Sequence, residues 1–232
     1  MDSEHAAGMA RALSDPLRIE ILSLLLAGGA TSAEAGGATV AEMVAATGST
    51  QPNMSNHLAV LRKEGLIRAV RAGRQMRYAL AGAQVAQLVE ALVTLSGSKG
   101  RPAPASPLAE ARSCYDHLAG RLGVAVLDAL VRKQALGPPG PGGAIGLGPG
   151  AAGVFHALRV DPAEAAKARR RFAFACLDWS ERRAHLGGAL GAALLDRLLA
   201  SGWVVRQPGT RALLVTTEGR RGLRRTLGVA GR

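Results

Sequence analysis

Helical spacing of apolar residues predicts four helices in the first third of the chain. Apolar side chains recur three or four positions apart, which places them on one face of a helix. Each of the last three segments begins near a residue that can cap free amides and ends at glycine. The expected helices cover residues 5–13, Asp15 to Gly28, Thr39 to Gly48, and Ser49 or Thr50 to Gly65. Residues 28–38 lack hydrophobic anchors and are expected to form a flexible insertion.

The pattern then changes to a period of two. Apolar residues such as Tyr78 and Leu80 alternate with other side chains, as in a half-buried strand. With a turn at Gly73, residues 67–80 are expected to form a β-hairpin. A further amphipathic helix is expected over 83–96, and its apolar face lacks an evident partner in so small a domain. A second copy of the chain, related by a two-fold axis, is the natural cover for this face.

The fourth expected helix has a polar face of amides and hydroxyls, whereas a helix built only for solubility would carry mostly Glu and Lys. Amide and hydroxyl side chains hydrogen-bond to base edges and phosphates. We therefore expect a DNA-recognition helix whose base-facing residues are Thr50, Gln51, Asn53, Ser55, Asn56 and His57. The hairpin is expected to act as a wing along the phosphate backbone, which would be neutralised by Arg62, Arg71, Arg74 and Arg77.

Positive charge is unevenly distributed along the chain, whose net charge is +12. Residues 1–96 hold eight basic and eight acidic residues, whereas 108–232 hold nineteen basic and nine acidic residues. A basic protein is drawn to polyanions, usually nucleic acid, although a solvated basic surface is the simpler explanation. The basic runs 167–171 and 220–225 are expected to be solvated helix faces or additional DNA contacts.

Other broad classes fit the sequence less well. An apolar run of 18 residues, long enough to span a membrane, is absent, and the acidic N-terminus does not resemble a secretion signal. We therefore expect a cytoplasmic protein without membrane attachment. Its two cysteines, Cys114 and Cys176, exclude a disulfide scaffold and are expected to be reduced.

The composition divides the chain into two expected domains. Residues 1–96 form a DNA-binding and dimerisation domain, residues 97–107 a linker, and residues 108–232 a second domain with a mobile Gly/Pro loop over 137–153. Residues 154–160 are expected to form a strand. A helix followed by a hairpin at the C-terminal end suggests a degenerate winged-helix unit. The expected fold class is mainly α with small β-hairpin wings.

The first domain resembles the ArsR/SmtB family of bacterial winged helix-turn-helix repressors. The resemblance is carried by "LSDPLRIEIL" at residues 13–22 and "SNHLAVLRKEGLI" at residues 55–67, in order and spacing. It implies a homodimer with two recognition helices in the major groove and wings on the flanking backbone. It also implies an inverted-repeat operator and release from DNA when an effector binds.

The familiar metal sites of that family are missing. Members that sense metals carry thiolates on the helix before the recognition helix, where this chain has Thr39 and Ala41. Others use Asp, His and Glu on the dimer helix, where residues 83–96 offer only Glu90. An effector site is therefore expected in the second domain.

Two clusters in the second domain could form that site. The residues are Cys114, Tyr115, Asp116 and His117 in one cluster, and Cys176, Asp178, Trp179, Arg182 and His185 in the other. Two thiols and two imidazoles suit zinc or another thiophilic ion. A redox pair of the two cysteines, a small-molecule pocket lined by Tyr115, Trp179, Arg182 and His185, and buried structural cysteines are the alternatives.

The sequence gives little support to the hypothesis that this protein is an enzyme. The segment 148–153 matches G-x-G-x-x-G in letters, but a dinucleotide site needs a strand before it and a helix after it. We expect a non-enzymatic transcriptional regulator, a repressor that binds double-stranded DNA as a homodimer. The alternatives are a general DNA-coating protein driven by the basic C-terminal half and a thiol enzyme with an attached DNA-binding module.

Overall fold

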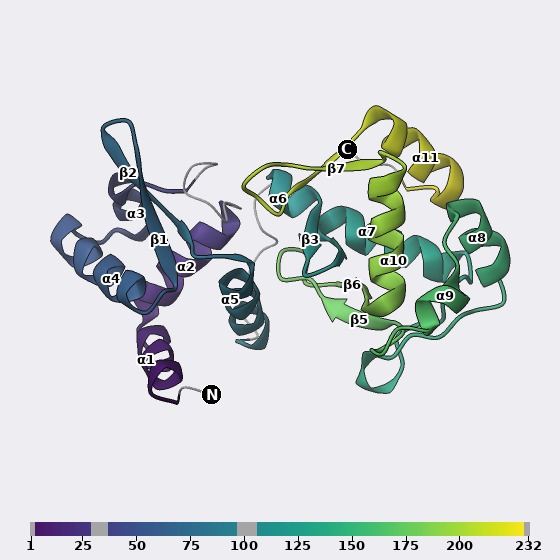
Figure 1. Ribbon diagram of the computed structural model, residues 1–232, viewed down its shortest axis with the longest axis horizontal. Helices are drawn as coiled ribbons and strands as arrows, with labels where there is room; N and C mark the ends of the chain where they lie inside the picture. The colour runs from purple at the N-terminus through teal and green to yellow at the C-terminus, as the bar shows by residue number, and fades with distance from the viewer. Residues whose placement is uncertain (1–2, 29–36, 97–105, 230–232) are drawn as a thin grey trace. The chain divides into compact units, whose positions relative to one another are not determined.

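The computed structural model describes residues 3–28, 37–96 and 106–229 (Figure 1). The chain divides into two compact units, which are Met1–Ser98 with Pro208–Arg211, and Lys99–Gln207 with Ala212–Arg232. Within the described ranges, no helix is long and apolar enough to cross a membrane. Each unit is described by itself below.

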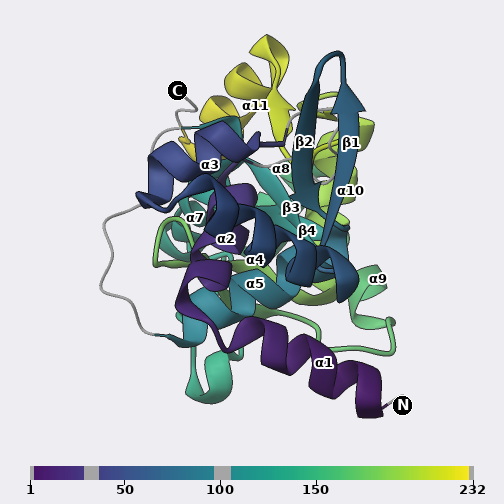
Figure 2. The same ribbon diagram turned by 90° about the vertical axis from the view of Figure 1, so that its left-hand side faces the viewer.

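The first unit is a winged helix-turn-helix. Its elements, in chain order, are α1 (Ser3–Leu13), α2 (Pro16–Ala27), α3 (Val40–Thr47), α4 (Gln51–Lys63), β1 (Ile67–Ala72), β2 (Gln75–Leu80) and α5 (Ala83–Leu95). These bounds confirm the expected elements to within about two residues, the usual uncertainty of helix ends. Figure 2 shows the antiparallel β1–β2 hairpin extending away from α4 and α5.

The helices around the turn begin and end at the residues that the sequence indicates. Thr39 and Glu42 form a reciprocal capping box at the start of α3. Gly48 and Gly65, which follow α3 and α4, both have a left-handed φ of 69°. Glycine enters this region at little steric cost, so these two residues fix where each helix stops.

The expected insertion over 28–38 is described only at its two ends, because residues 29–36 lie outside the described residues. Gly28 caps α2. Ala38 exchanges two backbone hydrogen bonds of 2.8 Å with Tyr78 of β2. The chain is therefore tied to the hairpin just before it enters α3.

A small apolar core holds the first unit together. Its members come from α2, α3, α4 and the hairpin, and the most buried include Ile21, Leu22, Met43, Met54, Leu58, Leu61, Leu66 and Leu80. The stripe Met54, Leu58 and Leu61 turns one face of α4 inward. The opposite face of α4 is therefore directed to solvent.

The described residues of the second unit form helices and three two-stranded hairpins. Its described elements are α6 (Pro107–Glu110), β3 (Arg112–Cys114), β4 (His117–Ala119), α7 (Gly120–Arg132), η1 (Pro141–Gly143), α8 (Ala151–Leu158), α9 (Pro162–Ala166), β5 (Phe174–Leu177), β6 (Ala184–Gly187), α10 (Gly188–Ala200), β7 (Val204–Arg206), β8 (Leu213–Val215) and α11 (Thr217–Leu227). The hairpin expected after α10 is thus present as β7–β8.

Three sequence expectations change in this unit. Residues 154–160 do not form a strand, because most of them belong to α8. A short apolar run fits a buried helix as well as a buried strand, so periodicity alone could not separate them. The loop expected over 137–153 ends at Gly150, where α8 begins. The linker expected over 97–107 lies outside the described residues for 97–105, and its last residue, Pro107, already belongs to α6.

One sequence pattern occurs twice in the second unit. The segment His-Leu-Ala/Gly-Gly-x-Leu-Gly begins at His117 and again at His185. In each copy a short hairpin leads directly into a long helix, β3–β4 into α7 and β5–β6 into α10. After this helix, each copy has an antiparallel backbone pairing at matching positions. It joins Leu136 to Leu147 in the first copy and Val204 to Val215 in the second. A last helix, α8 or α11, ends each copy.

Glycines at matching positions let the two copies pack closely. Helix α7 packs against β6 of the other copy, and α10 packs against β4. A Cβ atom at Gly123 would lie 2.5 Å from the Leu118 carbonyl oxygen, and one at Gly191 would lie 2.3 Å from that of Leu186. Neither position has room for a side chain, so glycine sets the distance between helix and hairpin in both copies.

We expect Gly191→Ala to lower the free energy of unfolding by about 1–3 kcal/mol, because an added methyl group must displace backbone atoms. Gly153→Ala is the matched control, since Gly153 lies within α8 and its Cβ position is open. That substitution should raise stability by about 0.4–1 kcal/mol. Urea unfolding of both variants measures the effects, and equal destabilisation by both would contradict the packing argument.

Candidate nucleic-acid interface and cysteine–histidine cluster

The polar face of α4 is open to solvent. Five of its six expected base-facing residues are exposed, and they are Thr50, Gln51, Asn53, Ser55 and Asn56. Thr50 occupies the N-cap position, yet its side chain makes no cap hydrogen bond. Asn53 Nδ2 donates to Ser49 Oγ at 3.1 Å, and Ser55 Oγ donates to the Gln51 carbonyl at 2.9 Å. These local bonds leave further donors and acceptors of the amides and hydroxyls for other groups.

His57 lies differently from the other five residues. It is half-buried, and its Nδ1 atom lies 3.6 Å from Asp15 Oδ1, at the N-cap of α2. Position 57 follows Met54 by three residues and adjoins Leu58, so it falls at the edge of the buried stripe. The structure therefore places His57 between α4 and α2, apart from the exposed polar face.

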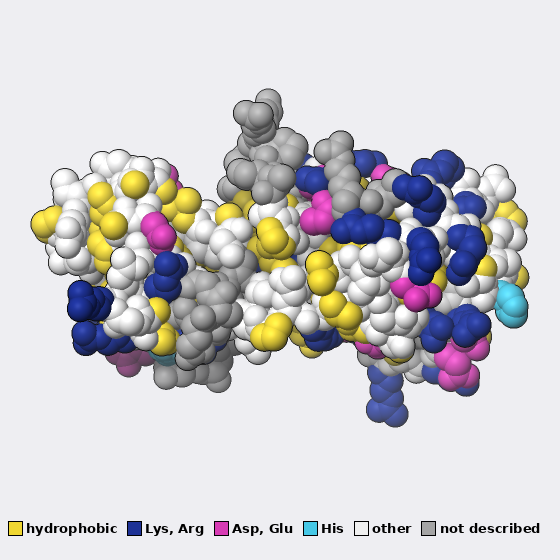
Figure 3. All heavy atoms as spheres, turned by 90° about the horizontal axis from the view of Figure 1, so that it is seen from above, with side chains coloured by type: hydrophobic (Ala, Val, Ile, Leu, Met, Phe, Trp, Pro, Cys, Tyr) yellow, Lys and Arg dark blue, Asp and Glu magenta, His cyan; other side chains and the backbone are white. Residues whose placement is uncertain are grey.

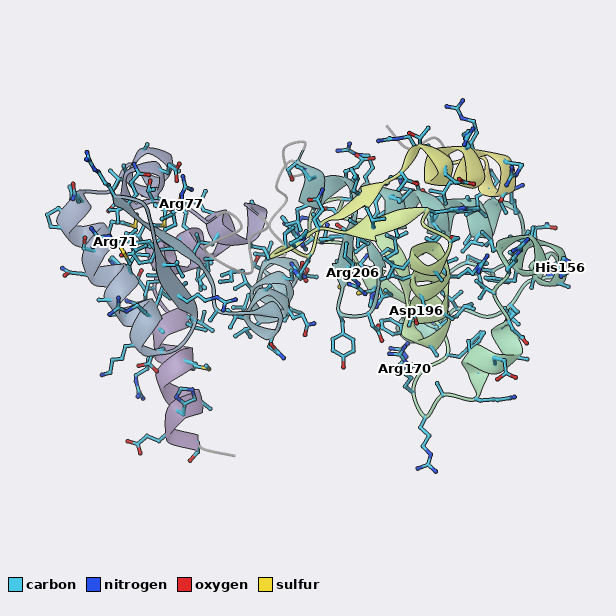
Figure 4. All side chains as sticks on the ribbon, turned by 45° about the horizontal axis from the view of Figure 1, so that its top comes forward. Arg71, Arg77, His156, Arg170, Asp196 and Arg206 are labelled. Carbon is cyan, nitrogen blue, oxygen red and sulfur yellow. The ribbon has the colours of Figure 1, made fainter. Side chains whose placement is uncertain are left out.

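The expected phosphate-contacting arginines lie on α4 and on the hairpin. Arg62, Arg71 and Arg74 are exposed, whereas Arg77 is half-buried. Arg77 donates a hydrogen bond of 2.8 Å to the Gly37 carbonyl. Other basic side chains gather over the second unit on the face that carries α11 (Figure 3). Figure 4 shows Arg71 and Arg77 on the hairpin of the first unit.

The two Cys–His pairs of the second unit form one cluster. Cys114 is the register partner of His117 in the β3–β4 hairpin, and Cys176 is the partner of His185 in β5–β6. One ligand atom from each of these four residues lies within 4.8 Å of the others. The two imidazole rings stack with centroids 5.1 Å apart. Both histidines are buried, and both cysteines are half-buried thiols.

A carboxylate stands behind each histidine. His117 Nδ1 lies 3.2 Å from Asp116 Oδ1, and His185 Nδ1 lies 3.3 Å from Asp178 Oδ2. The Nε2 atom of each ring is buried and has no hydrogen-bond partner among the described residues, and the same is true of His185 Nδ1, which contacts Asp178 as an ion pair only. Because a carboxylate faces each Nδ1 atom, Nε2 is the nitrogen that each ring can offer to a ligand.

Asp178 is the most heavily bonded carboxylate of the unit. It accepts hydrogen bonds from Arg112 Nη2 at 3.0 Å, the Gly120 amide at 2.7 Å and Ser180 Oγ at 2.7 Å. Arg112 is itself fully buried and lies over the Trp179 ring. Burial alone would raise the pKa of Asp178, but the interaction with His185 and the charge of Arg112 hold it well below its usual value.

The cluster also shifts the pKa of its own members. The contact with Cys176 and burial raise the pKa of the Cys114 thiol to about 11. Burial alone would lower the pKa of His185, but its interactions with Asp178 and Cys114 raise it. A nucleophilic cysteine needs a lowered pKa, so this environment does not favour the thiol-enzyme alternative.

The structure separates the residues expected to line a small-molecule pocket. The Tyr115 side chain is 73% exposed at the β3–β4 turn. Tyr115 lines a cavity of about 250 Å³ together with His117, Arg170 and Phe174, but Trp179, Arg182 and His185 are not among its lining residues. Gly148 and Gly150 serve packing, because a Cβ at either position would collide with backbone atoms of residues 133–135.

Removing the Asp178 charge should be costly. Asp178→Asn leaves the buried Arg112 without its carboxylate, and we expect the free energy of unfolding to fall by about 3–5 kcal/mol. Asp128 provides the control, because its ion pair with Arg183 is largely exposed. Asp128→Asn should cost less than about 1 kcal/mol. Chemical denaturation compares the two, and similar small losses would show that the Asp178 network contributes little.

Comparisons with known proteins agree with this architecture. Residues 13–70 match the family described as "Helix-turn-helix domain". The chain is 35% identical over 225 residues to the uncharacterized HTH-type transcriptional regulator YdfF of Bacillus subtilis, covering 93% of this chain and 94% of that protein. It is 41% identical over 93 residues to the HTH-type transcriptional regulator CmtR of Mycobacterium tuberculosis, covering 40% and 72% respectively. The solved structure of the cadmium metal-sensor CMTR from Mycobacterium tuberculosis covers 43% of this chain and 96% of its own, with 37% identity and a TM-score of 0.33.

Proposed function

Because this chain belongs to the family of HTH-type transcriptional regulators, with a winged helix-turn-helix unit of the ArsR type, we propose that it represses transcription by binding a specific operator as a homodimer. The observation that carries this proposal is the exposed polar face of α4, together with exposed arginines on the hairpin. Its chemistry is recognition rather than catalysis, and it acts in the cytoplasm.

Helix α4 reads the operator in the major groove. Its buried stripe fixes the helix on the core, so the amides of Gln51 and Asn53 are presented at a defined angle. Such amides pair with base edges in a bidentate manner and thereby distinguish one base pair from another. Phosphate contacts do not distinguish one base sequence from another, but they fix the position of the protein along the duplex. We assign these contacts to Arg62, Arg71 and Arg74. His57 supports α4 through Asp15 instead of reading bases.

Two copies of the chain associate through α5. Leu88 and Leu95, seven residues apart on one face of this helix, are 38% and 82% exposed. A second copy that packs its own α5 there would bury both leucines and form an isologous interface. The two α4 helices would then meet an inverted repeat whose half-sites are about one helical turn apart.

The effector acts on the second unit. The hydroxyl of Thr39, at a family metal-site position, is used to cap α3, and Ala41 offers no ligand atom. The second unit instead gathers two thiols and two imidazoles within 4.8 Å. Binding there changes the affinity for DNA, and linkage then requires that DNA binding change the affinity for the effector by the same factor.

Base-reading and phosphate-binding residues should differ in their effects. Gln51→Ala and Asn53→Ala should each weaken binding to the preferred duplex by about 1–3 kcal/mol and relax sequence preference. Arg74→Ala should weaken binding to all duplexes and reduce the salt dependence. The measurement is a salt titration of affinity for the duplex selected by the wild-type protein from a random pool, and for a scrambled duplex.

Arg132→Ala, which removes an exposed arginine from α7 in the second unit, is the control and should change neither affinity nor preference. Equal losses on selected and scrambled duplexes for all three test variants would contradict the assigned roles. Failure of the wild-type protein to select any sequence would favour a general DNA-coating protein driven by the basic C-terminal half.

The dimer should depend on the exposed leucines of α5. We expect Leu88→Glu or Leu95→Glu to weaken self-association at least about tenfold, because a buried leucine contributes roughly 1.5–3 kcal/mol. Gln84→Glu places the same charge at an exposed position of the same helix and should leave the dimer intact. Sedimentation equilibrium gives the association constants, and unchanged dimers in both leucine variants would place the interface elsewhere.

A further inference from the structure

The duplicated pattern of the second unit brings one cysteine and one histidine from each copy to the same place. The cross-packing of α7 on β6 and of α10 on β4 sets β4 beside β6. A Cβ at Gly123 would lie 3.4 Å from the His185 Cβ, and one at Gly191 would lie 3.1 Å from the His117 Cβ. The same glycine in each copy therefore adjoins the histidine of the other copy, as in a two-fold arrangement.

We propose that one thiophilic ion of the zinc type binds in the second unit and joins the two copies of the repeated pattern. Its tetrahedral site has two sulfur and two nitrogen ligands, which come from Cys114, His117, Cys176 and His185. Two thiolates and two imidazoles are a donor set that zinc binds in closed tetrahedral sites. The proposal concerns the second unit alone, so the existence of the site does not depend on DNA binding.

The spacing of the four groups fits such an ion. Metal–ligand bonds of about 2.0–2.3 Å in a tetrahedron place the donor atoms about 3.3–3.8 Å apart. The four donors already lie within 4.8 Å of one another. A contraction of about 1 Å, within reach of small side-chain rotations, would complete the coordination.

The carboxylates that face the histidines support the same conclusion. Asp116 and Asp178 face the Nδ1 atoms of His117 and His185, an arrangement that orients a metal-binding imidazole and leaves Nε2 for the ion. A buried polar atom without a partner costs about 1–3 kcal/mol, and both Nε2 atoms lack one among the described residues. A polar layer built only for structure would satisfy these atoms, whereas a bound ion explains why they are left open.

The ion would hold the two hairpins together. Each hairpin alone contributes one Cys–His pair, so the ion adds a direct link between β3–β4 and β5–β6. Because the proposed function places the effector in the second unit, the ion is also the effector class that we assign. That regulatory part rests on the proposed function, whereas the site does not.

Metal titration of the full-length protein tests the site. The protein is purified under reducing conditions, stripped with a chelator, and titrated with Zn²⁺ and separately with Co²⁺. We expect one ion per chain, thiolate-to-cobalt charge-transfer absorption and the visible bands of tetrahedral cobalt. Cys114→Ser, Cys176→Ser and His185→Gln should abolish this signature. His156→Gln is the control, because His156 is exposed on α8, and it should bind normally (Figure 4).

A milder substitution tests the role of the carboxylate behind His117. Asp116 is partly exposed, so Asp116→Asn should fold normally and bind the ion about 10–100-fold more weakly. Asp196→Asn, at an exposed position of α10, should leave the affinity unchanged. Asp116 is thus a positioning residue, and its effect would appear as reduced metal affinity with the cobalt spectrum retained.

Several results would overturn the site. One is a folded protein with two titratable thiols that binds neither ion. Another is binding that survives all three ligand variants. A third is formation of a Cys114–Cys176 disulfide under mild oxidation by a protein that binds no metal, which would favour the redox alternative.

A parallel measurement separates the site from the proposed function. The affinity of metal-free and metal-loaded protein for the selected duplex should differ by about 5–150-fold if the ion is the effector. Stoichiometric metal binding with unchanged DNA affinity would leave the site intact and overturn the effector assignment. Metal binding by a protein that prefers no DNA sequence would leave the site intact and overturn the proposed function.

Discussion

The second unit depends on one buried carboxylate. Asp178, between β5 and β6, binds Arg112 of β3, the first amide of α7 and Ser180, and it faces His185. These partners come from both copies of the repeated pattern. A buried ion pair is stable only when its charges and remaining polar atoms are satisfied together, so the hairpins must keep this arrangement. The positions of His185 and of the cysteine–histidine cluster follow from it.

The two units use short helices and strands to build different kinds of surface. In the first unit, a buried stripe turns a polar helix face outward, and glycines stop the helices on either side of the turn. That arrangement presents side chains to a large charged partner. In the second unit, glycines bring helices against hairpins and enclose thiols and imidazoles. That arrangement suits a small ligand. The chain thus joins an open recognition surface to a closed donor set.

Local patterns predicted the first unit well because its elements follow from neighbouring residues. The capping box at Thr39 and the stop at Gly65 act within a few positions, and both are present. The strand that ends at Leu80 is also present, but its burial increases along the strand and does not alternate. His57 shows the limit of this reasoning. Its position in the sequence fits a base-reading face, but its side chain is half-buried, with Nδ1 3.6 Å from Asp15 Oδ1, more than forty positions earlier. Arg77 likewise donates to a carbonyl that no local pattern identifies.

In the second unit, the sequence determined that two cysteines and two histidines were available, and it carried the repeat beginning at His117 and His185. The sequence pattern predicts a degenerate winged-helix unit, a helix followed by a hairpin. These elements are present as α10 and β7–β8, but they are only part of the repeat. Tertiary structure alone decided that the four side chains meet, that Tyr115 is exposed, and that Arg112 is buried. Residues from distant strands meet only through cross-packing of helices on hairpins, and that packing depends on backbone distances set by glycines, which spacing along the chain does not reveal.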